Sequence, residues 1–184
     1  MPKVLTTCLI ICLLVTIPIT AMAKRARDGE AVITLRSAQP CFSYPQDEEI
    51  KKGDYLFDYL AVSKAGPQGD TGGWVIQLAD YHKKILVEPN SPATCIRYGA
   101  IPPSAEEITH AKPLAFNTPY RAFLRVSTAS GSEQRYASDF CLIRNPKGDV
   151  VLTGVDWEHT QYEPLCLKPG EAPKRSFWQK LFGK

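Results

Sequence analysis

The sequence lacks an excess of charge of either sign. Its 22 lysines and arginines are nearly balanced by 19 aspartates and glutamates, which gives a formal net charge of +3 at pH 7. Proteins that hold nucleic acid through its phosphates concentrate basic residues, and this composition predicts no such surface. We therefore expect no nucleic-acid partner.

The sequence also lacks the motifs of common enzyme classes. It has no Gly-x-Ser-x-Gly elbow, no His-Glu-x-x-His zinc motif and no glycine-rich nucleotide fingerprint. It has only three histidines, and His82, His110 and His159 are isolated from one another. We expect no enzymatic activity, no cofactor and no metal site. The alternative is a hydrolase whose site no motif reveals.

The sequence also lacks any long segment with helical periodicity, any internal repeat and any low-complexity segment. The chain has instead short β-prone segments, with turn signals about every 8–12 residues. This pattern predicts one domain over residues 24–167, an all-β antiparallel β-sandwich of about 7–9 short strands. We expect residues 47–52 to form a loop, and Glu106, Glu107 and His110 to lie in a polar connection. The expected strands are 31–35, 41–44, 55–64, 74–78, 85–87, 95–99, 120–126, 136–143 and 150–155.

Residues 1–23 have the features of a signal peptide. Residues 4–19 are almost uninterruptedly apolar, and Ala21-Met22-Ala23 has the small-x-small form that signal peptidase accepts. We expect cleavage there and export to the periplasm, without a lipid anchor, because neither cysteine of this segment lies in a lipid-attachment motif. The alternative is an uncleaved anchor, because basic residues directly after the site oppose export. These residues are Lys24, Arg25 and Arg27.

Four cysteines remain after the signal peptide: Cys41, Cys95, Cys141 and Cys166. An even number in an exported chain favours two disulfides in an oxidising compartment, and the alternative is four buried free thiols in the cytosol. Zinc is disfavoured because no two of them have close ligand spacing. Four cysteines allow three connectivities, among which the residues alone do not choose. A bond between Cys41 and Cys141, with Trp74 against it, would resemble the inter-sheet bridge of antibody domains.

The densest group of candidate binding residues follows the last expected strand. It mixes acidic residues with large aromatic ones, which is typical of a protein-binding hot spot where a ring fills a pocket and charges steer the approach. The alternative is that Trp157 ends the strand inside the core and its neighbours are merely solvated. The residues are Asp156, Trp157, Glu158, His159 and Tyr162.

Residues 168–184 form a tail of different composition. A linker, 168–173, precedes the basic and aromatic segment 174–184, in which Ser176 is placed to cap one or two helical turns. One interpretation is a weak contact with a membrane surface. We favour the other, a frayed tail or a short helix docked on the sandwich, because so short a helix is unstable alone.

Several short motifs between Cys41 and Ile143 are similar to those of a known family. Together they resemble the type VI secretion immunity proteins of the enterobacterial periplasm, many of which are lipoproteins. The resemblance implies a small immunoglobulin-like β-sandwich that blocks a toxin delivered to the periplasm. The motifs are Cys41-Phe42-Ser43-Tyr44-Pro45, Cys95-Ile96-Arg97-Tyr98-Gly99 with Ile101-Pro102, Lys112-Pro113-Leu114 with Asn117, Tyr120-Arg121-Ala122-Phe123-Leu124 and Phe140-Cys141-Leu142.

The chain departs from this family by having no lipid-attachment cysteine and by carrying the extra pair Cys141 and Cys166. The resemblance implies a disulfide between Cys41 and Cys95, which lie in the shared motifs, and leaves the extra pair to join each other. It also implies a function, the neutralisation of a cognate secreted toxin by occlusion of the toxin's active site. The alternative is a periplasmic inhibitor of another enzyme, such as a lysozyme inhibitor. The oligomeric state is not indicated.

Overall fold

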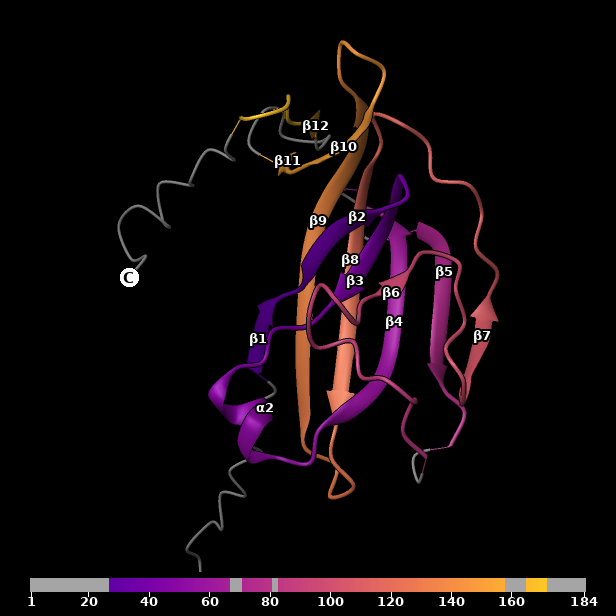
Figure 1. Cartoon of the computed structure of the whole chain (residues 1–184), viewed down its shortest axis with the longest axis vertical. Coiled ribbons are helices and arrows are strands. Elements are labelled where there is room, and N and C mark those ends of the chain that lie inside the picture. Colours follow the sequence, from indigo (N-terminus) through magenta and orange to yellow (C-terminus); the bar gives the residue numbers. More distant parts are fainter. Residues whose placement is uncertain (1–26, 67–70, 81–82, 158–164, 172–184) are drawn as a thin grey trace, which may run out of the picture.

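The computed structural model describes residues 27–66, 71–80, 83–157 and 165–171 (Figure 1). Nearly all regular structure in these residues is β-strand, arranged as a large sheet with a smaller sheet in front of it in Figure 1. The predicted all-β, sandwich-like fold with two disulfides is therefore confirmed. Its specifically immunoglobulin-like arrangement stays a prediction. The expected signal peptide and residues 172–184 of the tail lie outside the described residues.

The large sheet has the strand order β1-β9-β8-β4-β5-β7, and β10 also pairs with β9. Every neighbouring pair is antiparallel except β1 and β9, which run parallel, so the predicted wholly antiparallel pairing is wrong at this edge. Parallel strands need a long connection, and here most of the domain lies between the two strands. The strands are β1 (Arg27–Glu30), β4 (Leu56–Lys64), β5 (Thr71–Leu78), β7 (Ala105–Thr109), β8 (Pro119–Ser127), β9 (Glu133–Arg144) and β10 (Val150–Thr153).

The small sheet consists of β2 (Val32–Arg36), β3 (Gln39–Ser43) and β6 (Ile96–Arg97). It packs on one face of the large sheet through aromatic residues that belong to one buried cluster. The ring of Phe42 lies 5.8 Å from that of Phe140, and Tyr44 stacks on Tyr136 at the same distance. These rings bury large apolar areas, so the core lies between the two sheets.

Side-chain alternation along β8 distinguishes the two faces of the large sheet. Tyr120, Ala122, Leu124 and Val126 are buried, whereas the residues between them are only half-buried. The buried set faces the small sheet, because successive side chains of a strand point to opposite faces. The other side of the sheet, which carries Arg121, Phe123 and Arg125, is called the open face below.

One end of the open face is covered by a short strand pair, β11 (Val155–Asp156) and β12 (Leu165–Cys166). Cys141, Ile143 and Val155 form a second, smaller buried cluster there, against which Val151 and Cys166 pack. This cluster is separate from the main core because Cys141 and Ile143 alternate with Leu142, which belongs to the main core. The strand pair thus extends the structure to the far side of the large sheet.

The segment 47–52, predicted to be a loop, contains the short helix α2 (Glu48–Lys52). Asp47 caps it, because its Oδ1 accepts a hydrogen bond from the Ile50 amide at 2.8 Å. The acidic first turn and basic last turn also match the helix dipole. The local cap therefore stabilises a helix where the charged composition of the segment predicted a loop.

Two further expectations are wrong. Residues 85–87 form no strand: Ile85 is buried in the core while Leu86 is 82% exposed, so a loop inserts one side chain into the core. The polar connection that carries Glu106 and Glu107 is the edge strand β7, which pairs with β5. Charged residues are common on edge strands, where they discourage pairing with other chains, and this makes such strands resemble loops in sequence.

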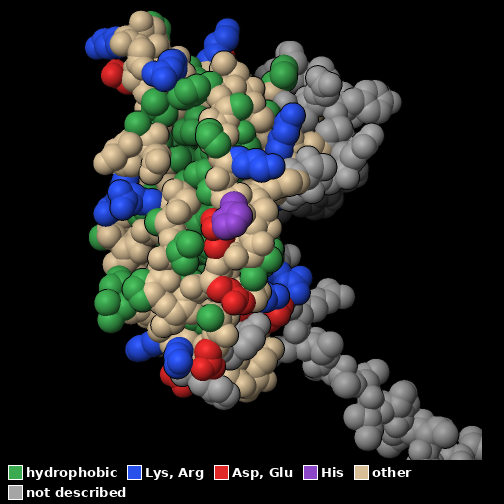
Figure 2. Space-filling view, turned by 90° about the vertical axis from the view of Figure 1, so that its right-hand side faces the viewer, with side chains coloured by type: hydrophobic (Ala, Val, Ile, Leu, Met, Phe, Trp, Pro, Cys, Tyr) green, Lys and Arg blue, Asp and Glu red, His purple; other side chains and the backbone are tan. Residues whose placement is uncertain are grey.

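The molecular surface seen from the β7 side carries charges of both signs (Figure 2). Basic and acidic side chains occur at several separate places on this face, with hydrophobic ones between them. None of the helices in the described ranges is long and apolar enough to span a membrane.

Candidate functional site

Two disulfides brace the fold. Cys41 of β3 is bonded to Cys95, just before β6, and Cys141 of β9 is bonded to Cys166 of β12. The pairing that the family resemblance implied is confirmed, and the antibody-like bond between Cys41 and Cys141 is excluded. The first bond fixes the small sheet, and the second ties the strand pair β11–β12 to the large sheet. Both are compatible with an oxidising, exported compartment.

Trp157 follows β11 directly and lies on the open face. Its side chain is 38% exposed, so it does not end the strand inside the core. The indole Nε1 donates a 2.8 Å hydrogen bond to Oδ2 of Asp139, and the guanidinium of Arg121 lies 5.5 Å from the ring centroid. Asp156, by contrast, is buried. Trp157 is therefore held in place while part of its ring faces solvent.

The other residues of the predicted hot spot, Glu158, His159 and Tyr162, lie outside the described residues. What joins Trp157 instead is a pair of residues from adjacent strands. Arg121 of β8 donates two hydrogen bonds to Asp139 of β9, from Nε to Oδ1 at 2.7 Å and from Nη2 to Oδ2 at 2.9 Å. This bidentate geometry fixes the guanidinium plane beneath the indole.

A second charged cluster lies farther along the same two strands. Arg125 is paired with Asp58 of β4 and lies 3.7 Å from Glu133, which also accepts a 3.0 Å hydrogen bond from Arg135. Asp58 occupies a bulge in β4 and accepts a second hydrogen bond, from the Ser127 hydroxyl at 3.1 Å. The Arg125 guanidinium also lies 5.4 Å from the ring centroid of Tyr59, within cation–π range.

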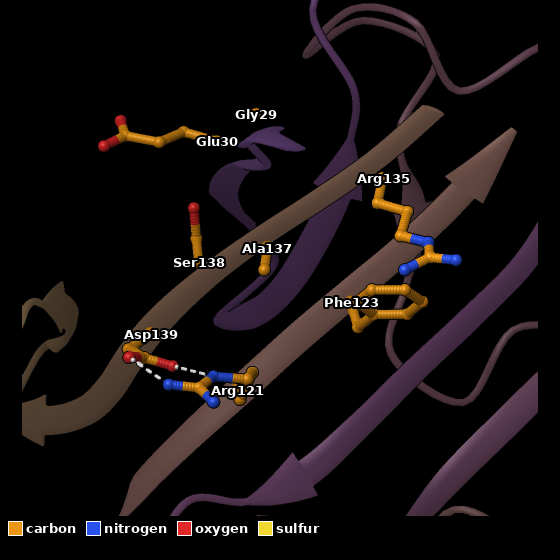
Figure 3. Close-up of a pocket in the computed structure, with 8 residues that line it drawn as sticks. All are labelled: Gly29, Glu30, Arg121, Phe123, Arg135, Ala137, Ser138 and Asp139. Carbon is orange, nitrogen blue, oxygen red and sulfur yellow. Dashed lines mark hydrogen bonds and ion pairs between the residues drawn. The ribbon is translucent and has the colours of Figure 1, made fainter. Parts of the chain in front are cut away.

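Between the two charged clusters the open face is hollowed. The hollow has a volume of about 740 Å³ and is lined by residues of β1, β8 and β9 (Figure 3). Figure 3 shows Arg135 near one end, the Arg121–Asp139 pair at the other, and Phe123 and Ala137 between them. Alanine at position 137 is too small to fill the space beside Phe123, and Glu30 of β1 lines a further side.

The sequence contains a signal for this site that lies outside the common enzyme motifs. Arg121, Phe123 and Arg125 alternate along one strand, which places them on one face once the strand is recognised. Asp139 and Arg135 alternate in the same way on the neighbouring strand. Which of these residues face each other depends on the register between β8 and β9, which pairs Arg121 with Asp139 and Arg125 with Arg135.

His110 forms a carboxylate–imidazole pair on the β7 edge. Its Nδ1 contacts Oε2 of Glu107, whose Oε1 accepts hydrogen bonds from the Trp74 indole at 3.0 Å and the Ala111 amide at 3.2 Å. Desolvation raises the pKa of Glu107, but the bonds from His110 and Ala111 outweigh it and lower the pKa below the ordinary 4.5. The imidazole is exposed, and every cysteine in the described part of the chain is in a disulfide. That part also holds no group of three or more metal-ligating side chains.

Glu88 is a largely buried carboxylate on the core side of the sheet. Its Oε2 accepts hydrogen bonds from the Tyr44 hydroxyl and the Phe57 amide, both at 2.9 Å. Its Oε1 is buried and has no hydrogen-bond partner among the described residues. Burial raises the pKa of Glu88 above the ordinary 4.5, although the two hydrogen bonds act in the opposite direction. Glu88 thus joins the loop after residue 83 to β4 and to the end of β3.

Comparison with known proteins adds no relative: neither protein-family models, nor curated protein sequences, nor solved structures give a match.

Proposed function

We propose that this chain is an exported, periplasmic immunity protein that binds a cognate type VI secretion toxin and occludes the toxin's active site. In this proposal the binding surface is the open face, with Trp157 as its anchor, and the protein has no turnover of its own. The observation that carries the proposal is the half-exposed Trp157, held by Asp139 and Arg121 at the edge of a hollow.

The composition of the open face supports a protein partner. Tryptophan, tyrosine and arginine dominate binding hot spots, because each offers a large contact area together with hydrogen-bonding or cationic groups. All three residue types occur here in Trp157, Tyr59 and the arginines 121, 125 and 135. Their partners within the protein already fix their orientations, so less conformational entropy is lost when they bind.

The scaffold supports occlusion of a partner's site. An immunity protein must bind tightly, and tight binding requires a surface that does not rearrange. The open face is built on the central strands β4, β8 and β9, and a disulfide connects β9 to the strand pair that carries Trp157. Such a rigid surface is suited to block access to the toxin's active site by covering it.

The experiment is a binding titration of the purified mature protein against the secreted protein encoded beside it, combined with survival of cells exposed to that protein. Trp157→Ala is expected to weaken binding by about 2 kcal/mol or more, which is roughly 30-fold, without lowering the melting temperature by more than a few degrees.

Phe116 provides the matched control. It is 37% exposed, and its ring lies 4.5 Å from the Arg144 guanidinium, but Arg144 is on the same side of β9 as the core residue Leu142. Phe116→Ala should therefore leave binding unchanged. If Trp157→Ala protects cells as well as the original protein at low expression, the anchor is elsewhere. If the original protein binds no co-encoded secreted protein, the immunity function is wrong.

A further inference from the structure

Two arginines face each other directly on the open face. The register of β8 and β9 pairs Arg125 with Arg135, and like charges in such cross-strand positions destabilise a sheet. Glu133 lies near both guanidinium groups, at 3.7 Å from Nη1 of Arg125 and 3.0 Å from Nη2 of Arg135. The two guanidinium groups therefore share Glu133 at the rim, while Arg125 is also paired with the buried Asp58. A further negative group at this place would relieve their repulsion.

Two of the acidic partners, Asp58 and Asp139, lie deeper than their arginines, whereas the Glu133 side chain is 32% exposed, much like that of Arg125. The Asp58 side chain is only 4% exposed, whereas those of Arg125 and Arg135 are 30% and 46% exposed. The same holds at the other cluster, where Asp139 is less exposed than Arg121. The arginines therefore reach the surface in both clusters, together with the partly exposed Glu133 and the exposed Glu30, and the local sum of charges is close to zero.

Arg135 has N–H donors available for a ligand. Its Nη2 donates to Glu133, and its other N–H groups have no hydrogen-bond partner among the described residues. A guanidinium presents up to five N–H donors in a plane that matches the two oxygens of a carboxylate. Arg135 also lines the hollow beside Phe123, so an anion bound to it would carry its neighbouring groups over that ring.

We propose that the open face binds an acidic segment of its partner, with a carboxylate at Arg125 and Arg135 and an adjacent apolar side chain in the hollow against Phe123. The two charged clusters lie four residues apart on β8, roughly 13 Å at the usual rise per residue, so a second carboxylate can reach Arg121. Glu30 at the side of the hollow repels carboxylates and confines them to the two arginine clusters. The inference deepens the proposed function and rests on it for the identity of the partner as a toxin.

The test uses synthetic peptides and the complete mature protein. The probe is a peptide in which glutamate and phenylalanine alternate, and two matched peptides carry glutamine or lysine in place of glutamate. Binding is followed by NMR chemical shifts and by titration at low and high salt. The variants are Arg135→Gln on the surface and, as the control, Arg97→Gln, which alters an exposed arginine on β6 of the small sheet.

The acidic peptide is expected to bind at least about tenfold more tightly than the glutamine peptide, with an affinity that falls as salt rises. Arg135→Gln should lose about tenfold, Arg97→Gln should change nothing, and the shifts should centre on Phe123 and Arg135. Equal affinity for the three peptides, or preference for the lysine peptide, overturns the proposal.

The same titrations separate this inference from the proposed function. If the acidic peptide binds as expected but the co-encoded secreted protein does not, the surface is supported and the immunity function is refuted. If the secreted protein binds with equal affinity to the original protein and to Arg135→Gln, the immunity function stands and the acidic-segment inference fails.

Discussion

Removal of the disulfide between Cys141 and Cys166 is expected to release Trp157 from the open face while the main core stays folded. The bond closes a loop of 25 residues, for which the chain-entropy relation gives about 3.5 kcal/mol of stability. The strand pair it holds is short, because β11 and β12 share only two residue pairs, Val155 with Cys166 and Asp156 with Leu165. Without the bond, β12 is held mainly by these two pairs, by the burial of Leu167 and by the hydrogen bond from the Leu167 amide to the Gly154 carbonyl at 3.0 Å.

The variant is Cys141→Ala combined with Cys166→Ala. Alanine is chosen because Cys141 is fully buried, and a serine hydroxyl would lack a partner there. Urea unfolding measures the loss of stability, and NMR of fluorine-labelled tryptophan, with signals assigned by Trp157→Phe, reports each indole separately. We expect a decrease of about 3–4 kcal/mol, a shift of the Trp157 signal to its solvent-exposed position, and an unchanged signal from the core residue Trp74.

The control removes the other disulfide, Cys41 with Cys95. It closes a loop of 54 residues, for which the same relation gives about 4 kcal/mol, so the two variants should lose similar amounts of stability. In the folded fraction of this control, the Trp157 signal should not move. The reasoning is refuted if loss of the Cys141–Cys166 bond leaves the Trp157 signal in place, or if it moves the Trp74 signal under native conditions.

Two further predictions concern the core. Because burial raises the pKa of Glu88, its carboxyl binds a proton more tightly in the folded protein than in the unfolded chain. The free energy of unfolding should therefore fall as the pH rises from about the ordinary 4.5 through the raised pKa. Glu88→Gln, whose amide oxygen still accepts hydrogen bonds from Tyr44 and Phe57, should flatten this part of the pH profile measured by urea unfolding. An unchanged profile would contradict the assignment. Gly73→Ala should destabilise the folded protein by about 1–3 kcal/mol or more, because the added Cβ would lie 2.2 Å from the backbone oxygen of Val62. If this variant unfolds at the same temperature as the original protein, the close approach of β4 and β5 is wrong.

The sequence by itself determined most of the long strands. Alternating apolar residues mark the buried side of β8, and Gly131 at φ 81° makes the turn that returns the chain into β9. Such patterns are local, because a strand with one buried face must alternate wherever it lies in the sheet. The same local reasoning predicted the mainly polar segment around Glu106 as a connection, since this edge strand lacks the apolar alternation and its Ile108 is exposed.

Only the tertiary structure decided which distant residues meet. The four cysteines were compatible with three pairings, and the family resemblance, not their spacing, selected the observed one. Arg125 facing Arg135, and Arg121 binding Asp139 beneath Trp157, both follow from the register of β8 and β9 and from the course of the chain after β10. Register is fixed by the burial of one face over the whole sheet, so it is not encoded in any short segment. The open face, and with it the candidate site, exists only because that register places three arginines, their acids and the aromatic rings side by side.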